Sequence, residues 1–397
     1  MADTEHQITD SDEQLILDSI SKWLTQKVKP VAMELEHDDV YPAALVEDMK
    51  ELGLFGALIE PEFGGLGLSA RTYSRIVSLI AEEWMSLTGI FNSHLMMALI
   101  VQRFGTDKQK QYWLPKFASG EIRGGLALTE PNAGTDLQAI TTRASREGDK
   151  YVVNGAKTWI SNAIQGHCVA LLCKTDPAAQ PRYKGMTMLI TQTKTPETGE
   201  PLPGVRNGNK LEKLGYKGID SGELIYDGYA CDAELSLVGG EEGQGFFMAT
   251  GGLEIGRINV AARSVGIAKR ALRESVAYAQ TRQTMGKPIG QHQAIQLKLG
   301  EMGAKTRAAE LLVADAARAY DEGGRVDLEA GMAKYFASET AVEVAMEAMR
   351  IHGGYGYSKE YPIERLYRDA PLMCIGEGTN EMQRIIIAKQ LMARNPV

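Results

Sequence analysis

The spacing of apolar residues changes twice along this chain of 397 residues, and that change limits the folds it can adopt. From about residue 9 to 120, apolar side chains recur every three or four positions, which is typical of amphipathic helices. Short β-rich runs occupy residues 125–235, and helical patterns return over residues 252–285, 291–322, 327–353 and 380–394. We therefore predict an α+β multidomain protein with an N-terminal helical domain (1–124), a middle β domain (125–236) and a C-terminal helical bundle (237–397).

The middle domain is expected to be antiparallel. Its β-rich runs are separated by Gly, Asn, Asp and Pro, and they lie at residues 151–154, 158–161, 168–173, 186–191 and 223–229. No long amphipathic helix lies between the runs, whereas parallel strands usually need such a crossover. We expect a small antiparallel sheet or barrel, with the Pro-, Gly- and Thr-rich residues 193–208 as a loop.

The charge balance and the cysteines exclude several functional classes. Forty-three basic against fifty-one acidic residues give a net charge of -8, which argues against a nucleic-acid-binding protein or a polybasic membrane anchor. The four cysteines form no C-x-x-C pair and no zinc-type spacing, so we expect reduced structural thiols and no metal site. The N-terminus resembles no targeting signal, and no apolar stretch looks long enough to span a bilayer. We therefore expect a cytoplasmic protein.

A glycine-flanked carboxylate, Glu377, lies between Gly376 and Gly378 just ahead of an apolar run that resembles a helix. Glycine on both sides removes bulk and lets a ligand approach the backbone closely. Asn380 and Gln383 suggest that a helix starts there with a capping box. The carboxylate could be a catalytic base, or it could only complement the helix dipole.

Two segments of the middle domain are candidates for binding a cofactor. Residues 127–136 combine Thr hydroxyls, small residues and a proline turn, so they could present N–H groups to a phosphate, or they could be an ordinary strand-to-turn junction. In residues 155–163, Trp159 and Ser161 fall on the same side of a strand, where Trp159 is either a core residue or the wall of a cofactor site.

These segments resemble motifs of the acyl-CoA dehydrogenase family. Further matches follow in the family's order, and they lie at residues 105–121, 213–221, 278–288, 291–294, 351–357 and 361–369. The resemblance covers almost the whole chain, so it is far more specific than any single motif. It implies an N-terminal helical domain, a middle β domain and a C-terminal four-helix bundle, in agreement with the pattern of the apolar residues.

The resemblance also implies an FAD site. Thr129 would bond the isoalloxazine, Thr135 would reach phosphate, Trp159 would pack on the ring and Ser161 would lie near N5. A neighbouring subunit would hold the adenylate and pyrophosphate, so a homotetramer built as a dimer of dimers is implied. The implied FAD contacts are Leu126, Leu128, Thr129, Gly134, Thr135, Trp159, Ile160, Ser161, Arg282, Met285, Gln293, Arg350, Gly353, Gly354, Thr379 and Glu381.

The implied reaction is α,β-dehydrogenation of an acyl-CoA thioester, with electrons passed to electron-transferring flavoprotein. Glu377 would take the α-proton while the β-hydrogen leaves as hydride to flavin N5. Some relatives carry the base at the position that is Gly256 here, which removes that candidate. Glu254, two residues away, would contact the CoA side beside Arg257, and it is the alternative base. The implied substrate contacts are Thr135, Glu254, Arg257, Gly376, Glu377 and Gly378.

The chain departs from the family pattern at three positions. Gly376 stands where many relatives have tyrosine, Met285 where they have phenylalanine, and Arg350 where they have glutamine. Loss of the tyrosine ring should enlarge the pocket, which suggests a branched, cyclic or bulky acyl group. The alternatives are an acyl-CoA oxidase, a family member that catalyses desulfination or decarboxylation, and a non-catalytic scaffold.

Overall fold

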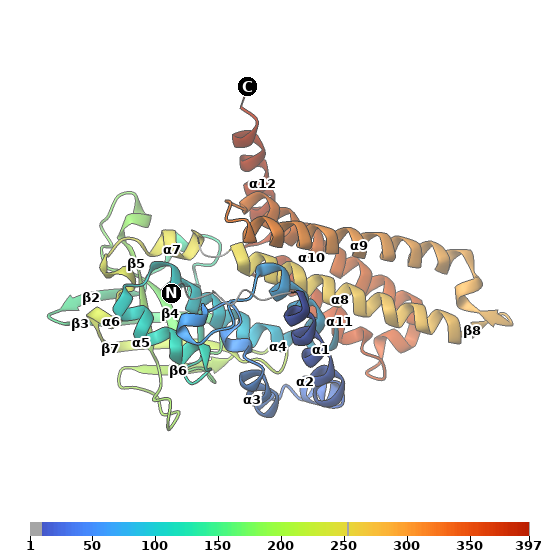
Figure 1. Cartoon of the computed structure of the whole chain (residues 1–397), viewed down its shortest axis with the longest axis horizontal. Helices are drawn as coiled ribbons and strands as arrows, with labels where there is room; N and C mark the ends of the chain where they lie inside the picture. Colours follow the sequence, from blue (N-terminus) through green and yellow to red (C-terminus); the bar gives the residue numbers. More distant parts are fainter. Residues whose placement is uncertain (1–9, 252–253, 397) are drawn as a thin grey trace.

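The computed structural model describes residues 10–251 and 254–396 and shows a helical domain, a sheet and a helical bundle in chain order (Figure 1). The N-terminal helices are α1 (Asp10–Trp23), α2 (Ala32–His37), α3 (Ala43–Glu51), α4 (Ala70–Phe104) and α5 (Asp107–Ala118). Helix α5 begins with a capping box in which Thr106 and Gln109 satisfy each other's backbone N–H groups. The predicted α–β–α order is confirmed.

Helix α4 is the central element of the fold. The sequence patterns at residues 73–83 and 93–103 belong to this one helix, which is kinked at Trp84. It is long and apolar enough to pass for a membrane span, contrary to our expectation, but 89% of the relevant window is buried inside the protein. Its apolar surface is therefore used by the protein core.

The middle domain contains a seven-stranded sheet that is mainly antiparallel. Its strands are β1 (Gly124–Ala127), β2 (Arg143–Glu147), β3 (Lys150–Ser161), β4 (Cys168–Lys174), β5 (Met186–Gln192), β6 (Val205–Lys210) and β7 (Ser221–Asp232). The strand order is β1-β4-β2-β3-β7-β6, and β5 pairs with β4. Strand β4 runs parallel to β1 and, through one residue pair, to β2. The prediction of an antiparallel sheet is therefore wrong for these two pairings. Strand β6 also extends into the end of the predicted loop.

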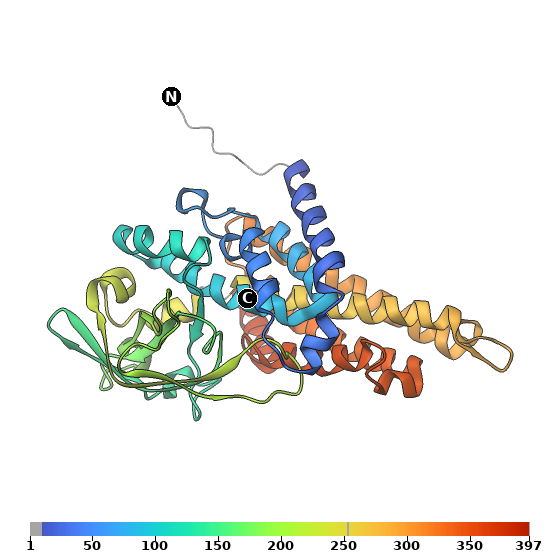
Figure 2. The same cartoon turned by 90° about the horizontal axis from the view of Figure 1, so that it is seen from below.

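The C-terminal bundle packs against α4 through small residues. Its helices are α8 (Glu254–Thr281), α9 (Gln293–Asp321), α10 (Asp327–His352), α11 (Ile363–Ile375) and α12 (Asn380–Arg394). A methyl group on Gly266 of α8 would lie 2.5 Å from the carbonyl oxygen of Ser78, so α4 and α8 approach closely only because this residue is glycine. Two short helices, α6 (Ala233–Ser236) and α7 (Gly245–Gly251), connect the sheet to the bundle. Figure 2 shows the bundle extending away from the sheet, with the hairpin of β8 (Gln283–Thr284) and β9 (Lys287–Pro288) at its far end.

Candidate active site

Glu377 lies in the turn between α11 and α12. Its φ of 57° and the φ of 85° at Gly378 place two successive residues in the left-handed region, which is uncommon for a glutamate. This turn directs the side chain toward α8 and α4. A methyl group on Gly256 of α8 would lie 3.0 Å from Oε2 of Glu377 and 3.2 Å from Sδ of Met96 on α4. The carboxylate therefore occupies the space that a side chain at position 256 would need.

The turn around Glu377 is held by a buried lysine of α10. Lys334 Nζ donates to the carbonyl oxygens of Cys374 (3.2 Å) and Gly378 (2.8 Å) and to Oδ1 of Asn380 (2.8 Å). Burial lowers the pKa of Lys334 to about 8, against the raising influence of nearby Cys374 and Glu377. Because all its contacts are on either side of Glu377, Lys334 is a positioning residue for the carboxylate.

The start of α12 differs from the sequence prediction. The N-cap is Thr379, whose hydroxyl accepts from the N–H of Met382 at 3.4 Å, and not Asn380. Gln383 does not complete a capping box, because its Nε2 donates to the carbonyl oxygens of Glu377 (3.3 Å) and Gly378 (3.2 Å). Both amide side chains therefore fix the turn that carries Glu377.

The electrostatic surroundings suit Glu377 for a base. Burial raises the pKa of this carboxyl above its ordinary value, although the positive charges of Arg263, Arg257 and Lys334 oppose the shift. A raised pKa brings a carboxylate closer to the range in which proton abstraction is efficient near neutral pH.

The two middle-domain segments expected to bind flavin lie side by side. The N–H of Thr158 donates to the carbonyl oxygen of Thr129 at 3.0 Å, which joins the segment of Leu126, Leu128 and Thr129 to that of Trp159, Ile160 and Ser161. Trp159 is 59% exposed with a φ of 61°, so it is not a core residue. A methyl group on Gly134 would meet nothing within 4 Å, and Thr135 is exposed. An exposed aromatic ring beside an open loop fits a planar cofactor such as FAD.

A buried ion pair that we did not predict holds this loop. Lys157 Nζ lies 2.9 Å from Oε1 of Glu130 and donates to the carbonyl oxygen of Leu128 at 2.8 Å. Burial alone would raise the pKa of Glu130, but the charge of Lys157 and hydrogen bonds from Thr141 and Thr142 lower it to about 2. The pair therefore fixes the backbone on which Thr129 lies.

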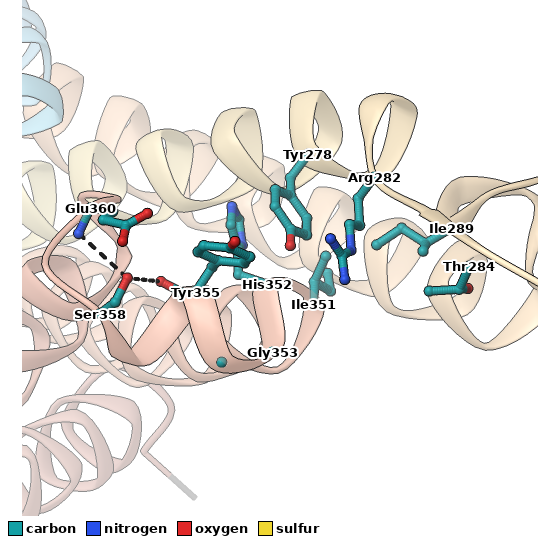
Figure 3. Close-up of a pocket in the computed structure, with 11 residues that line it drawn as sticks. Tyr278, Arg282, Thr284, Ile289, Ile351, His352, Gly353, Tyr355, Ser358 and Glu360 are labelled. Atoms are coloured by element: carbon teal, nitrogen blue, oxygen red, sulfur yellow. Dashed lines mark hydrogen bonds between the residues drawn. The ribbon is translucent and has the colours of Figure 1, made fainter.

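Of the expected FAD residues on the C-terminal bundle, only some lie close together. Arg282, Gly353 and Gly354 line a cleft of about 570 Å³ together with Tyr278 and Tyr355 (Figure 3). The other three lie outside its lining. Met285 is 95% exposed in the β8–β9 hairpin, Gln293 is exposed at the start of α9, and Arg350 is paired with Glu347. Thr379 and Glu381 lie beside Glu377 at the start of α12.

The two groups lie on different parts of the chain. The first is on the middle domain, whereas the cleft is lined by residues at the C-terminal ends of α8 and α10 and by the β8–β9 hairpin (Figure 3).

The acidic and basic residues at the start of α8 are engaged with other charges. Arg257 is paired with Asp327 at 3.2 Å, and Glu254 lies 3.9 Å from Arg103. Burial and Asp327 raise the pKa of Glu254, while Arg103 opposes the shift. Glu377, and not Glu254, is the carboxylate placed against Gly256.

Within the described ranges, one histidine-containing group has ligand atoms close enough for a metal ion, formed by Glu36, His37 and Glu364. Arg368 already places its guanidinium between the two carboxylates, at 2.6 and 2.8 Å from Glu36 and 2.7 Å from Glu364. The guanidinium thus occupies the place that a cation would take, and the group is an ion-pair network.

Several of these residues carried a signal that sequence analysis did not use. Lys334 lies on the alanine-rich face of its helix, Lys157 alternates inward in a strand, and Arg263 interrupts the apolar face of α8. A charged residue at a core position indicates a polar network that must satisfy it.

The order of the three domains decides the family. "Acyl-CoA dehydrogenase, N-terminal domain" matches residues 10–121, the middle domain of the same family residues 125–229, and its C-terminal domain residues 243–392. The chain belongs to the acyl-CoA dehydrogenase family. It is therefore an oxidoreductase, the members of its family are flavoproteins, and the predicted fold class is confirmed.

Relatives of this acyl-CoA dehydrogenase align over most of its length. It is 37% identical over 387 residues to (2S)-methylsuccinyl-CoA dehydrogenase of Cereibacter sphaeroides, covering 96% of this chain and 70% of that protein. It is 37% identical over 382 residues to the mitochondrial short-chain specific acyl-CoA dehydrogenase of Homo sapiens, covering 96% and 90%. Butyryl-CoA dehydrogenase from Megasphaera elsdenii has the same fold, with a TM-score of 0.90, 34% identity and coverage of 99% and 100%.

Proposed function

We propose that this protein is an FAD-dependent dehydrogenase that converts an acyl-CoA thioester to the 2-enoyl-CoA, with Glu377 as the base. The observation that carries the proposal is the position of the Glu377 carboxylate. It lies against Gly256, in a turn fixed by Lys334 and Gln383, and burial raises its pKa. This combination of a fixed geometry and a raised pKa is what general-base catalysis requires.

The residues of this chain would act in defined ways. Glu377 removes the α-proton of the thioester, and its backbone N–H stabilises the developing charge on the thioester oxygen. FAD, when bound, supplies the acceptor for the β-hydrogen. Trp159 and the Thr129 loop would hold the flavin ring, while Arg282 and the Gly353–Gly354 backbone would hold the diphosphate.

We further propose that the two groups of FAD residues meet across a subunit interface in a homotetramer. Exposed apolar side chains on the bundle support this assembly, and they are Met285, Leu297, Leu311, Ile385 and Met392. Helix α12 projects from the body of the chain, which fits a role in contacts with a neighbour (Figure 1). Electron-transferring flavoprotein is the proposed electron acceptor.

The proposed acyl group is branched or bulky. A side chain at Gly376 would meet only the carbonyl oxygen of Leu372, at 3.5 Å, so the position has room that glycine leaves open. The Cereibacter sphaeroides relative is named for methylsuccinyl-CoA, whose acyl group is branched. Both observations support an enlarged pocket near Glu377.

The test is anaerobic reduction of the bound flavin by a panel of acyl-CoA thioesters, followed at about 450 nm. Glu377→Gln should retain FAD and lose the absorbance decrease, whereas Glu254→Gln should still show it at saturating substrate. If Glu377→Gln still reduces the flavin, the base has been assigned wrongly. Rapid oxygen consumption by the reduced wild type would favour the oxidase alternative.

A further inference from the structure

A row of polar residues extends from Glu377 along the interface between α4 and α8. Gly256, Asn259 and Arg263 are separated by three and four residues on α8, so they lie on one face of the helix. On the antiparallel α4, the residues opposite are Met96, Asn92 and Thr88 in descending order. The interface beyond the base is therefore polar, although it is built from two helices that are otherwise largely apolar.

The part of this row nearest Glu377 is a chain of hydrogen bonds. Nδ2 of Asn259 donates to the hydroxyl of Tyr73 at 2.8 Å, and this hydroxyl donates to Oδ1 of Asn92 at 3.1 Å. All three side chains are buried. Oδ1 of Asn259 has no protein partner within the described ranges, so the network keeps an acceptor available.

The next polar residue along this face of α8 is Arg263. Its Nη1 donates to the hydroxyl of Tyr216 at 3.2 Å, and its Nη2 donates to the carbonyl oxygen of Thr88 at 3.4 Å. The side chain is 4% exposed, and its Nε has no protein partner among the described residues. Both of its contacts are neutral.

The other buried arginines of α8 show what Arg263 lacks. Arg257 lies 3.2 Å from Asp327, and Arg270 lies 2.6 Å from Glu83. In the part of the chain that the structure describes, no carboxylate lies within 4.0 Å of Arg263. A buried cation without a counter-ion is unfavourable, so an anion that reached Arg263 would be bound favourably.

The direction of the Arg263 side chain and its distance from Gly256 suit the binding of an acyl group. Side chains of a helix lean toward its N-terminus, so Arg263 leans toward Asn259 and the level of Gly256. The seven residues from Gly256 to Arg263 rise by roughly 10 Å, part of which the arginine side chain spans. Arg263 is also the strongest opposing charge on the Glu377 carboxyl. An acyl group that enters past Glu377 therefore ends near the guanidinium if it is short.

We propose that the substrate is a short acyl-CoA whose acyl group ends in a second carboxylate, which pairs with Arg263. Asn92, Asn259, Tyr73 and Tyr216 hold the surrounding polar groups in place. The proposal rests on the proposed function, because it names the substrate class of the same site. The competing explanation is that Arg263 serves only as a counter-ion for Glu377, in which case it would assist every acyl-CoA equally.

The test compares substrates that differ only in the terminal charge. Glutaryl-CoA and methylsuccinyl-CoA are each paired with the neutral analogue in which the free carboxylate is a primary amide. We expect wild-type kcat/KM to favour the carboxylates by roughly ten- to a hundredfold, the range of one hydrogen-bonded charge. Arg263→Gln should remove that preference, so that the ratio of kcat/KM for the carboxylate to kcat/KM for its amide falls to about one, while Arg263→Lys should keep part of it.

The outcomes distinguish a failure of this inference from a failure of the proposed function. If wild type turns over the amides or simple acyl-CoAs as well as the diacids, the inference is overturned while the proposed function stands. An equal loss for all substrates in Arg263→Gln would also overturn it and favour the counter-ion explanation. If no acyl-CoA reduces the flavin, the proposed function itself fails. The wild-type comparison decides the question even if the Gln variant does not fold.

Discussion

Replacing Gly256 with alanine should separate stability from catalysis at this site. The new methyl group would lie 3.0 Å from Oε2 and 3.2 Å from the carboxyl carbon of Glu377. It would also lie 3.2 Å from Sδ of Met96, and ordinary contacts begin near 3.4 Å. Something must therefore move by a few tenths of an ångström.

The magnitude follows from which side gives way. Lys334 and Gln383 fix the backbone on both sides of Glu377, so the carboxylate has to rotate away from α8. A displacement of about 1 Å at a reacting group can lower a rate by about a hundredfold, so a few tenths should lower the reductive rate by roughly five- to tenfold. In the opposite direction, alanine in a helix interior is favoured over glycine by about 1 kcal/mol. We expect a slower enzyme that is not less stable.

The assay is stopped-flow flavin reduction at saturating acyl-CoA together with a thermal melt. Gly300→Ala in α9 is the matched control, because a methyl group there meets nothing within 4 Å. The control should gain the same helix stability and keep the wild-type rate. If Gly256→Ala reduces the flavin as fast as wild type, the contact between position 256 and Glu377 does not position the base.

Three further results are expected. Folding raises the pKa of Glu377, so the contribution of this carboxyl to stability falls as pH rises from its unfolded pKa through its folded pKa. At pH 8, Glu377→Gln should therefore melt at a higher temperature than wild type. This difference in melting temperature should vanish near pH 4. Lys334→Met should retain FAD but lower kcat by at least about tenfold, since the turn loses three donated bonds. We expect kcat of wild type to fall as pH rises through about 8, where Lys334 loses its proton, and this decrease should be absent from the variant. An unchanged kcat would contradict the positioning role. Gly376→Tyr should fold normally and shift preference from branched to straight acyl chains, and an unchanged ranking across the panel would refute the enlarged pocket.

The sequence predicts elements well where apolar residues recur with a regular period, even where the chain alone leaves them exposed, as in α12. The limits of α12 agree with the predicted residues 380–394, and β4 with 168–173 to within one residue. The prediction lacks strands β1, β2 and β6, because Gly124–Ala127 and the polar Arg143–Glu147 and Val205–Lys210 have little intrinsic strand preference. Their neighbours in the sheet define them. Helix α11 was missed because Pro371 lies inside it.

The site is predictable only in part, for a different reason. Glu377 itself was found from the order of family motifs, whereas the local motif left its role open. Its left-handed backbone, its contact with Gly256 and the bonds from Lys334 depend on three helices meeting, and no local pattern encodes them. The domain limits and the individual FAD contacts stay predictions.

The position of Arg263 shows how far such dependence extends. Its guanidinium bonds the hydroxyl of Tyr216, and that hydroxyl lies where a methyl group on Gly89 would be, only 1.5 Å from it. Any side chain at position 89 would therefore displace Tyr216 and remove a partner from Arg263. Three segments, from α4, the loop before β7 and α8, thus share one constraint that none of them displays alone. If Arg263 selects a carboxylate, then Gly89→Ala should weaken that selection from a distance, since the displaced Tyr216 no longer holds the guanidinium in place.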